Sequence, residues 1–198
     1  MAIVVEHEKR RKEILQKSLD VFIEEGYEDV TYQKIADRCN ITRTTLYIYF
    51  RNKHEIFLGS IKELLNSIEK DLLSFVTDKT LSREDALRSV ISTIIDRCEA
   101  SRKLFSIILA YLLQLKKSGT DPNERVRRRV IRLRHHLNTL LIAGIKAKEF
   151  KDTSVGDMND LLFGLIESAV FRLVILNQQD ISDIRRTINL AIDGLMAN

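Results

Sequence analysis

The sequence is poor in residues that form turns, with one proline and seven glycines among 198 residues. A fold of many short strands needs frequent turns, and these two residue types supply most of them. Alanine, leucine, isoleucine, glutamate, lysine and arginine instead recur in long runs with the period of a helix. We therefore predict an all-α fold of about nine helices.

Cysteines and long apolar runs are also scarce. Cys39 and Cys98 match no metal-binding or redox spacing, so we expect small buried side chains in a reducing compartment. The longest apolar stretch, residues 107–113, is far below the roughly 20 residues that cross a bilayer. The N-terminus runs from apolar to charged, the reverse of a secretory signal. These features predict a soluble, cytoplasmic protein with no metal, cofactor or membrane partner.

No strong excess of one charge is present. The net charge of +4 and the isoelectric point near 9.1 permit nucleic-acid binding without requiring it. Up to residue 57, ten basic residues are balanced by ten acidic ones. Basic residues gather at 9–12 and 43–53, whereas acidic residues gather at 24–29, which would have to face away from DNA. For residues 9–12, a solvated helical turn and a phosphate-binding arm both remain open.

The most informative stretch carries the signals of two short helices joined by a tight turn. Thr31 is typical of the N-cap of a helix over 32–38, and Thr42 of the N-cap of a helix over 43–49. Asn40 lies at the turn between them, and asparagine enters the left-handed backbone region at little cost. The pattern predicts a helix-turn-helix whose second helix enters the major groove of DNA.

The second helix of this motif is expected to have a buried and an exposed side. Leu46 and Phe50 are predicted to face inward. Arg43, Thr44 and Thr45 then form the reading edge, with a solvated helix surface as the alternative. Arginine can bind a guanine edge through two hydrogen bonds, and threonine can touch a thymine methyl.

A set of residues between positions 10 and 57 is typical of one group of regulators. The set comprises Gly26 after an apolar helix, Thr31, Ile35-Ala36, Thr45-Leu46-Tyr47, Tyr49-Phe50 and Lys53. With these residues the chain resembles the tetracycline-repressor (TetR) family of transcription regulators. The family usually has Ala-Gly where this chain has Cys39-Asn40, and most often glycine where it has Thr44. The second departure lies on the reading edge, so the resemblance implies groove contact but no particular base sequence.

The resemblance also implies that Tyr47 and Tyr49 anchor DNA phosphates through their hydroxyls. Lys53 opens the next helix, where its ammonium and the backbone N–H groups can share a phosphate. The partner would be a double-stranded DNA operator. The predicted DNA contacts are Thr31, Gln33, Thr42, Arg43, Thr44, Thr45, Tyr47, Tyr49 and Lys53.

A helix over 53–75 follows the motif without a linker. We therefore expect a DNA-binding domain over 1–52, with three helices, and an effector-binding and dimerisation domain over 53–198, a helical bundle. Start signals for the later helices are Ser82, Ser101, Asp121 with Pro122, Ser154, and Asp180 or Ser182.

The arginine-rich run from Arg125 to Arg134 has two interpretations. Arg125, Arg128, Arg129 and Arg132 lie opposite an apolar stripe, which is typical of a solvated helix face. A binding site for an anion, either an acidic effector or DNA, is the alternative. The adjacent pair His135 and His136 lacks the i, i+4 spacing of a metal site on a helix.

The resemblance implies a pocket for a small-molecule effector of unknown identity. Its candidate lining residues are Ile91, Phe105, Ile108, Tyr111 and Leu137, each of which could equally be core. In the last two helices the apolar residues are too many for one buried stripe, which favours a four-helix homodimer interface over a wider core. The predicted interface residues are Leu162, Leu165, Ile166, Ala169, Leu173, Ile184, Ile188, Ala191 and Leu195.

These features together predict a homodimer that binds a palindromic operator. By resemblance it would be a repressor, released when an effector tilts the 53–75 helix and changes the spacing of the reading helices. A DNA-binding regulator without a small-molecule ligand, constitutive or controlled by a partner protein, is the alternative. An enzyme is disfavoured, because the sequence has no HExxH motif, phosphate-binding loop or Ser-His-Asp arrangement.

Overall fold

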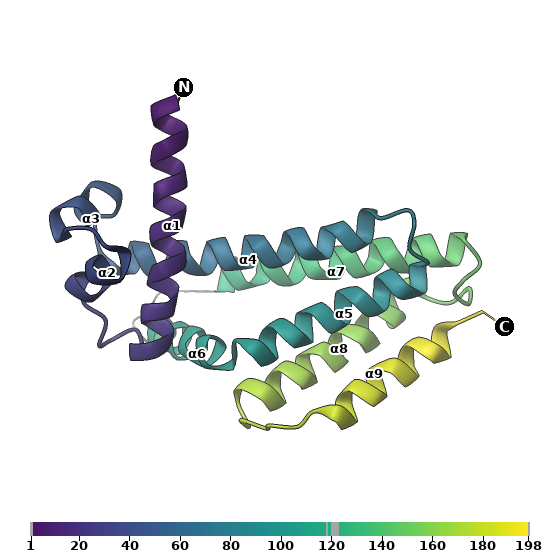
Figure 1. The fold of residues 1–198 in the computed structure, drawn as a ribbon. Helices are drawn as coiled ribbons and strands as arrows, with labels where there is room; N and C mark the ends of the chain where they lie inside the picture. The colour runs from purple at the N-terminus through teal and green to yellow at the C-terminus, as the bar shows by residue number, and fades with distance from the viewer. Residues whose placement is uncertain (1, 118, 120–122, 198) are drawn as a thin grey trace. The chain divides into compact units, whose positions relative to one another are not determined.

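The computed structural model of the protein describes residues 2–117, 119 and 123–197, and helices account for most of them (Figure 1). Within these residues the one β-pairing is an isolated antiparallel bridge between Phe150 and Met196. The prediction of an all-α fold is confirmed. The helices are α1 (Ala2–Glu25), α2 (Tyr32–Cys39), α3 (Arg43–Tyr49), α4 (Lys53–Thr77), α5 (Arg83–Ala100), α6 (Arg102–Lys117), α7 (Asn123–Lys146), α8 (Val155–Val174) and α9 (Ser182–Leu195).

The described chain forms two compact units, one up to Ile68 and the other from Glu69 onward. The division falls inside α4, because the first turns of this helix pack against α1. Ser60 shows this contact, since its hydroxyl donates a 2.7 Å hydrogen bond to the backbone oxygen of Leu15. The functional boundary expected between residues 52 and 53 stays a prediction.

The N-terminal unit has a small apolar core to which all four of its helical segments contribute. Gly59 of α4 allows close approach to α1, since a Cβ atom there would lie 2.8 Å from Cδ2 of Leu15. This core fixes the position of α3 relative to the rest of its unit. The buried side chains include Ile14, Leu15, Val21, Phe22, Val30, Ile35, Ala36, Leu46, Phe50, Ile56 and Phe57.

In the C-terminal unit α5, α7 and α8 pack against one another, and α9 packs on α8 and α5 (Figure 1). The end of α7 requires a glycine: a Cβ atom at Gly144 would lie 2.1 Å from Cδ2 of Phe150, which covers that position. Lys148 turns the chain with φ of 62°, and the N–H of Glu149 donates to the oxygen of Gly144 at 2.9 Å. Phe150 is thereby folded back onto the helix that precedes it.

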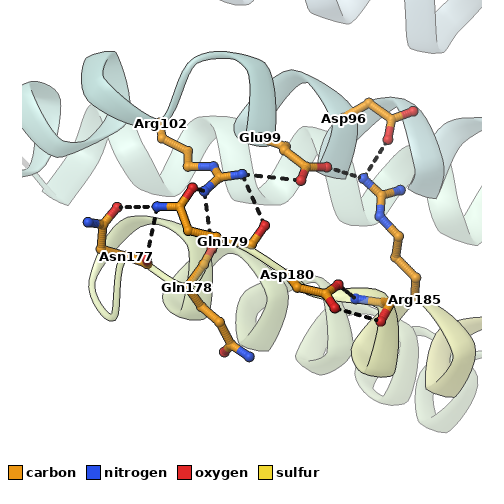
Figure 2. A network of polar contacts seen from close by, with 9 residues as sticks. Asp96, Glu99, Arg102, Asn177, Gln178, Gln179, Asp180 and Arg185 are labelled. Atoms are coloured by element: carbon orange, nitrogen blue, oxygen red, sulfur yellow. Dashed lines mark hydrogen bonds and ion pairs between the residues drawn. The ribbon is translucent and has the colours of Figure 1, made fainter.

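A network of polar contacts joins the corner between α5 and α6 to the segment between α8 and α9 (Figure 2). Arg102 donates to the backbone oxygen of Gln178 at 3.2 Å and to Oε1 of Gln179 at 2.8 Å. Arg185 of α9 pairs with Asp96 and Glu99 of α5, each at 2.7 Å. Because these groups are partly solvated, the network orients the segment more than it stabilises the fold.

The predicted helix starts agree with the structure at Ser82 and Ser154, whose hydroxyls accept from the N–H groups of Asp85 and Asp157 at 2.9 and 3.3 Å. The start predicted at Asp121 and Pro122 lies outside the described residues. The first helix begins at Ala2 and ends at Glu25. The α8 helix ends at Val174.

Candidate nucleic-acid interface

The turn between α2 and α3 is built by the residues that the sequence singled out. The side chain of Thr31 accepts from the N–H of Lys34 at 3.3 Å, and that of Thr42 accepts from the N–H of Thr45 at 3.0 Å. Asn40 adopts the left-handed conformation, with φ of 54° and ψ of 46°. These contacts fix two short helices in a helix-turn-helix, as predicted.

The α3 helix exposes one continuous side. Leu46 is fully buried, whereas Arg43, Thr44 and Tyr47 are exposed. Ile48, which the sequence analysis did not select, is exposed as well. A helical wheel would have revealed it, because a residue two positions from a buried leucine lies on the opposite side of the helix.

Tyr47 is held in place from two sides. Its ring stacks on the ring of Tyr32, the first residue of α2, with centroids 4.5 Å apart and planes at 16°. The hydroxyl of Tyr32 donates to the backbone oxygen of Phe50 at 3.0 Å, and this hydrogen bond fixes the position of the Tyr32 ring. On the other side Arg43 donates from Nη2 to the hydroxyl of Tyr47 at 3.3 Å. Two predicted contact residues are therefore brought together, and Tyr32 is a supporting residue that the sequence analysis missed.

The location of Tyr32 beneath Tyr47 raises the pKa of its hydroxyl. Burial, together with the nearby Tyr47 and Glu55, raises the pKa of Tyr32 to about 12. The phenol therefore keeps its proton at neutral pH and can act as the donor in its hydrogen bond to Phe50.

Tyr49, at the end of α3, is held by α1. Its ring stacks on the imidazole of His7, with centroids 4.5 Å apart. One turn later on α1, the guanidinium carbon of Arg11 lies 4.8 Å above the ring of Phe50. The first turns of α1 thus support the end of the candidate reading helix, a role that apolar periodicity alone does not indicate.

Lys53, predicted to bind a phosphate, has partners inside the unit. Its ammonium donates to the backbone oxygen of Glu28 at 2.9 Å and lies 4.8 Å from the ring centroid of Tyr27. The side chain therefore pins the loop between α1 and α2 to the start of α4. A phosphate contact by Lys53 stays a prediction.

The remaining predicted contacts lie around this helix. Thr31 and Thr42 serve as N-caps, and Gln33 donates to Oδ1 of Asp37 at 2.7 Å. Thr45 is half-buried, and its hydroxyl lies 2.8 Å from that of Thr42. These four side chains maintain the motif, and DNA contact by any of them stays a prediction.

The acidic segment at 24–29 is partly neutralised within the unit. Glu24 pairs with Arg38, and Glu25 pairs with Lys34 at 2.7 Å. Glu25, Lys34 and Arg38 also line a shallow surface hollow of about 490 Å³ between α1 and α2. Its mixed charge makes it a poor match for a phosphate backbone.

The effector residues predicted in the C-terminal unit are mostly interior. Ile91, Tyr111 and Leu137 are buried, whereas Phe105 and Ile108 are half-buried. The structure thus places them where either a packed core or a ligand contact would be found. Their role in binding stays a prediction.

In the C-terminal unit, His136 on α7 is a polar side chain with a buried ring nitrogen. Its Nε2 atom is buried and has no hydrogen-bond partner among the described residues. Burial lowers the pKa of His136, which favours the neutral imidazole. A buried imidazole nitrogen without a partner requires an explanation, and a bound polar ligand is one.

The arginine-rich run has acidic partners within the unit. Arg129 and Arg132 pair with Glu69 at 2.7 and 3.0 Å, and Arg134 pairs with Asp160. The side chain of Arg125 lies outside the described part of the structure. These partners reduce the positive charge that an anion would meet.

The predicted dimer residues divide into two sets. Leu165, Ala191 and Leu195 are half-buried. The other six are buried in the core of their own chain, and their assignment to an interface stays a prediction: Leu162, Ile166, Ala169, Leu173, Ile184 and Ile188. Apolar side chains of the same region that are exposed include Leu161, Phe171, Ile175, Leu176 and Leu190.

Over the residues that the structure describes, no group of three or more His, Cys, Asp or Glu side chains is placed to hold a metal ion. Over the same residues, no helix combines the length and apolarity needed to cross a bilayer.

The capped helix-turn-helix, with its exposed arginine, threonine and tyrosine, defines a DNA-binding protein of the helix-turn-helix class. Residues 14–59 match the family model described as bacterial regulatory proteins, tetR family. The chain belongs to the TetR family of transcriptional regulators, and it is a regulator, not an enzyme.

Two relatives and one solved structure illustrate the similarity. The uncharacterized HTH-type transcriptional regulator TtgW of Pseudomonas putida is 30% identical over 122 residues, which cover 61% of this chain and 87% of that protein. The fatty acid metabolism regulator protein of Bacillus subtilis is 25% identical over 175 residues, covering 87% and 88%. The crystal structure of the regulator FadR from Bacillus subtilis in complex with stearoyl-CoA is 23% identical, covering 93% and 96%, and its TM-score of 0.62 shows a shared fold.

Proposed function

We propose that the protein is a repressor that binds a palindromic operator as a homodimer and is released from it by a small molecule. In this proposal residues 1–52 bind DNA, and residues 53–198 bind the effector and dimerise. The α4 helix contributes residues to both compact units. It is therefore the segment through which effector binding would change the spacing of the two α3 helices.

The observation that carries the DNA-binding role is the fixed position of Tyr47 between Tyr32 and Arg43. Exposed tyrosine and arginine side chains are usually mobile, and ordering them on binding costs entropy. Here the stack and the hydrogen bond order both side chains in advance. In this proposal Tyr47 would donate its hydroxyl to a phosphate, and Arg43 would reach a guanine edge beside Thr44.

The homodimer is supported by exposed apolar surface on α8 and α9. Leu190 of α9 is 71% exposed, and Phe171 of α8 is also exposed. A monomer would leave these side chains in water, whereas a four-helix interface with a second copy would bury them. Two-fold symmetry would separate the α3 helices by about 34–36 Å or a multiple of this distance, which matches half-sites on one face of DNA.

The effector is supported by the comparisons and by the Nε2 atom of His136, which has no hydrogen-bond partner among the residues that the structure describes. One similar protein is a fatty acid metabolism regulator, and one similar structure was solved with stearoyl-CoA. Fatty acids and their CoA thioesters are therefore the first class to test. Within this chain, His136 would hydrogen-bond a polar group of the ligand while the apolar residues around Tyr111 would contact its chain.

The test is selection of bound sequences from random double-stranded DNA by the full-length protein. We expect enrichment of a sequence with inverted-repeat character, and the absence of any enriched sequence would contradict the proposal. The selected operator is then titrated with protein in the presence of fatty acids, acyl-CoA thioesters and a wider metabolite library. Release by one compound class supports the repressor with an effector. Operator binding that no compound changes would favour a regulator controlled by a partner protein, or a constitutive one.

A further inference from the structure

An isoleucine lies exposed on the candidate reading helix. The side chain of Ile48 is 69% exposed, whereas Leu46, two residues earlier, is fully buried. Since successive residues of a helix are about 100° apart, Ile48 lies roughly 160° around the axis from Leu46. Thr44 lies one turn before it, so Thr44 and Ile48 are neighbours on the outermost edge of α3.

Packing within the chain does not explain why position 48 carries an isoleucine. A β-branched side chain is slightly unfavourable in a short helix, and at this exposure it gains little from burial. The aromatic side chains on either side of it are both engaged, Tyr47 by Tyr32 and Tyr49 by His7. Ile48 therefore projects outward between two ordered rings, with its branched end left for a partner.

The exposed side of α3, on which Ile48 lies, indicates which partner this side chain would contact. Tyr47 and Arg43 beside it are suited to phosphate and guanine, so the outer edge of α3 would face the floor of the major groove. The C5-methyl group of thymine is the apolar group that unmodified base pairs present there. An isoleucine at this position could make no hydrogen bond and would select for that methyl group.

We propose that Ile48 is a specificity-determining residue that contacts a thymine methyl group in each operator half-site. The proposal rests on the proposed function, because it takes α3 as the reading helix. It assigns Ile48 a different role from Arg43, whose contact is polar. Ile48 would discriminate thymine from cytosine and uracil at one base pair, and it would leave the salt dependence of binding unchanged because no charge is involved.

The test combines Ile48→Ala with removal of single methyl groups from the DNA. In the operator obtained by selection, each thymine of one half-site is replaced in turn by deoxyuridine, and dissociation constants are measured for the full-length protein. For the wild type we expect one or two positions at which deoxyuridine weakens binding about three- to tenfold. Ile48→Ala should weaken binding to the unmodified operator by a similar factor, and deoxyuridine at those positions should then have no further effect.

Matched variants separate this role from others. Ile131→Ala removes an isoleucine that is 55% exposed on α7, and it should leave both affinity and methyl dependence unchanged. Thr44→Ser removes the other methyl group on the outer edge of α3. If deoxyuridine sensitivity persists in Ile48→Ala but disappears in Thr44→Ser, the contact belongs to Thr44 and the proposal is wrong. Thermal unfolding of Ile48→Ala should match the wild type, since the side chain packs against little of its own chain.

Failure of this inference can be distinguished from failure of the proposed function. If Tyr47→Ala and Arg43→Ala weaken operator binding while no thymine methyl couples to Ile48, only the role of Ile48 is overturned. If none of the three substitutions changes operator affinity, α3 is not the reading helix, and both proposals fail together.

Discussion

The ring of Tyr32 lies against the ring of Tyr47, with the two centroids 4.5 Å apart. This contact joins the first residue of α2 to the exposed side of α3, so the two helices of the motif support one another at the surface as well as in the core. The hydroxyl of Tyr32 bonds to the backbone at Phe50, where α3 ends. Rigid presentation of α3 therefore depends in part on Tyr32, a side chain outside that helix.

The raised pKa of Tyr32 predicts a loss of stability in alkali. The pKa rises from 10.0 in the unfolded chain to about 12 in the folded protein. The unfolded chain therefore loses the proton first, and the stabilising contribution of Tyr32 is fully present below pH 10 and lost as the pH rises towards 12. Urea unfolding at pH 9 and 11 should show a smaller decline for Tyr32→Phe than for the wild type. An equal decline in both proteins would show that Tyr32 does not carry this dependence.

Asn40 should tolerate glycine but not alanine. Its left-handed conformation, with φ of 54°, costs an ordinary L-residue about 1–2 kcal/mol. Asn40→Ala should lower the free energy of unfolding by about 1 kcal/mol, whereas Asn40→Gly should change it little. Chemical denaturation of the three proteins compares them directly. Equal stability of the alanine and glycine variants would mean that the turn relaxes to another conformation.

Gly144 should be intolerant of alanine because of its contact with Phe150. The added Cβ would lie 2.1 Å from the ring, so the ring or the chain after α7 must move, at a cost of about 1–3 kcal/mol. Gly156→Ala on α8 is the matched control, since a Cβ there has only an ordinary contact of 3.7 Å. The difference between the two variants in urea unfolding is the quantity to measure. Similar stabilities would show that Phe150 adapts without cost.

The exposed residues of α8 and α9, and not the buried ones, should control dimerisation. Phe171→Glu and Leu190→Glu place charge on surface that the proposed dimer would bury, and they should shift sedimentation at micromolar concentration towards the monomer. Helical content by circular dichroism should be unchanged, because both side chains are exposed in the single chain. A wild-type chain that sediments as a monomer would remove the dimer altogether.

The local chemistry of the motif could be predicted from the sequence, because caps and turns depend on residues a few positions apart. Thr31, Asn40 and Thr42 were predicted with the roles that they have in the structure. The supporting contacts of Tyr32 and His7 could not be predicted from the sequence, because ring stacking depends on how the helices pack against one another.

The six predicted dimer residues that are buried in the single chain illustrate the same limit. Apolar periodicity shows that Leu162 and Ile188 face a protein interior, but it does not show whose interior. In the structure they lie in the core of their own chain. The surface left for a partner is formed by residues such as Phe171 and Leu190, which a count of apolar residues does not separate from the core.

The central claim is that α3 reads DNA with Tyr47 as an anchor, and operator affinity of Tyr47→Ala tests it most directly. The dissociation constant should rise about tenfold or more while the protein remains folded by circular dichroism, because one ordered phosphate contact is lost from each α3 helix. Tyr47→Phe keeps the ring and loses the hydroxyl, so its dissociation constant should lie between those of the wild type and Tyr47→Ala. An unchanged dissociation constant for Tyr47→Ala would contradict the assignment of α3 as the reading helix.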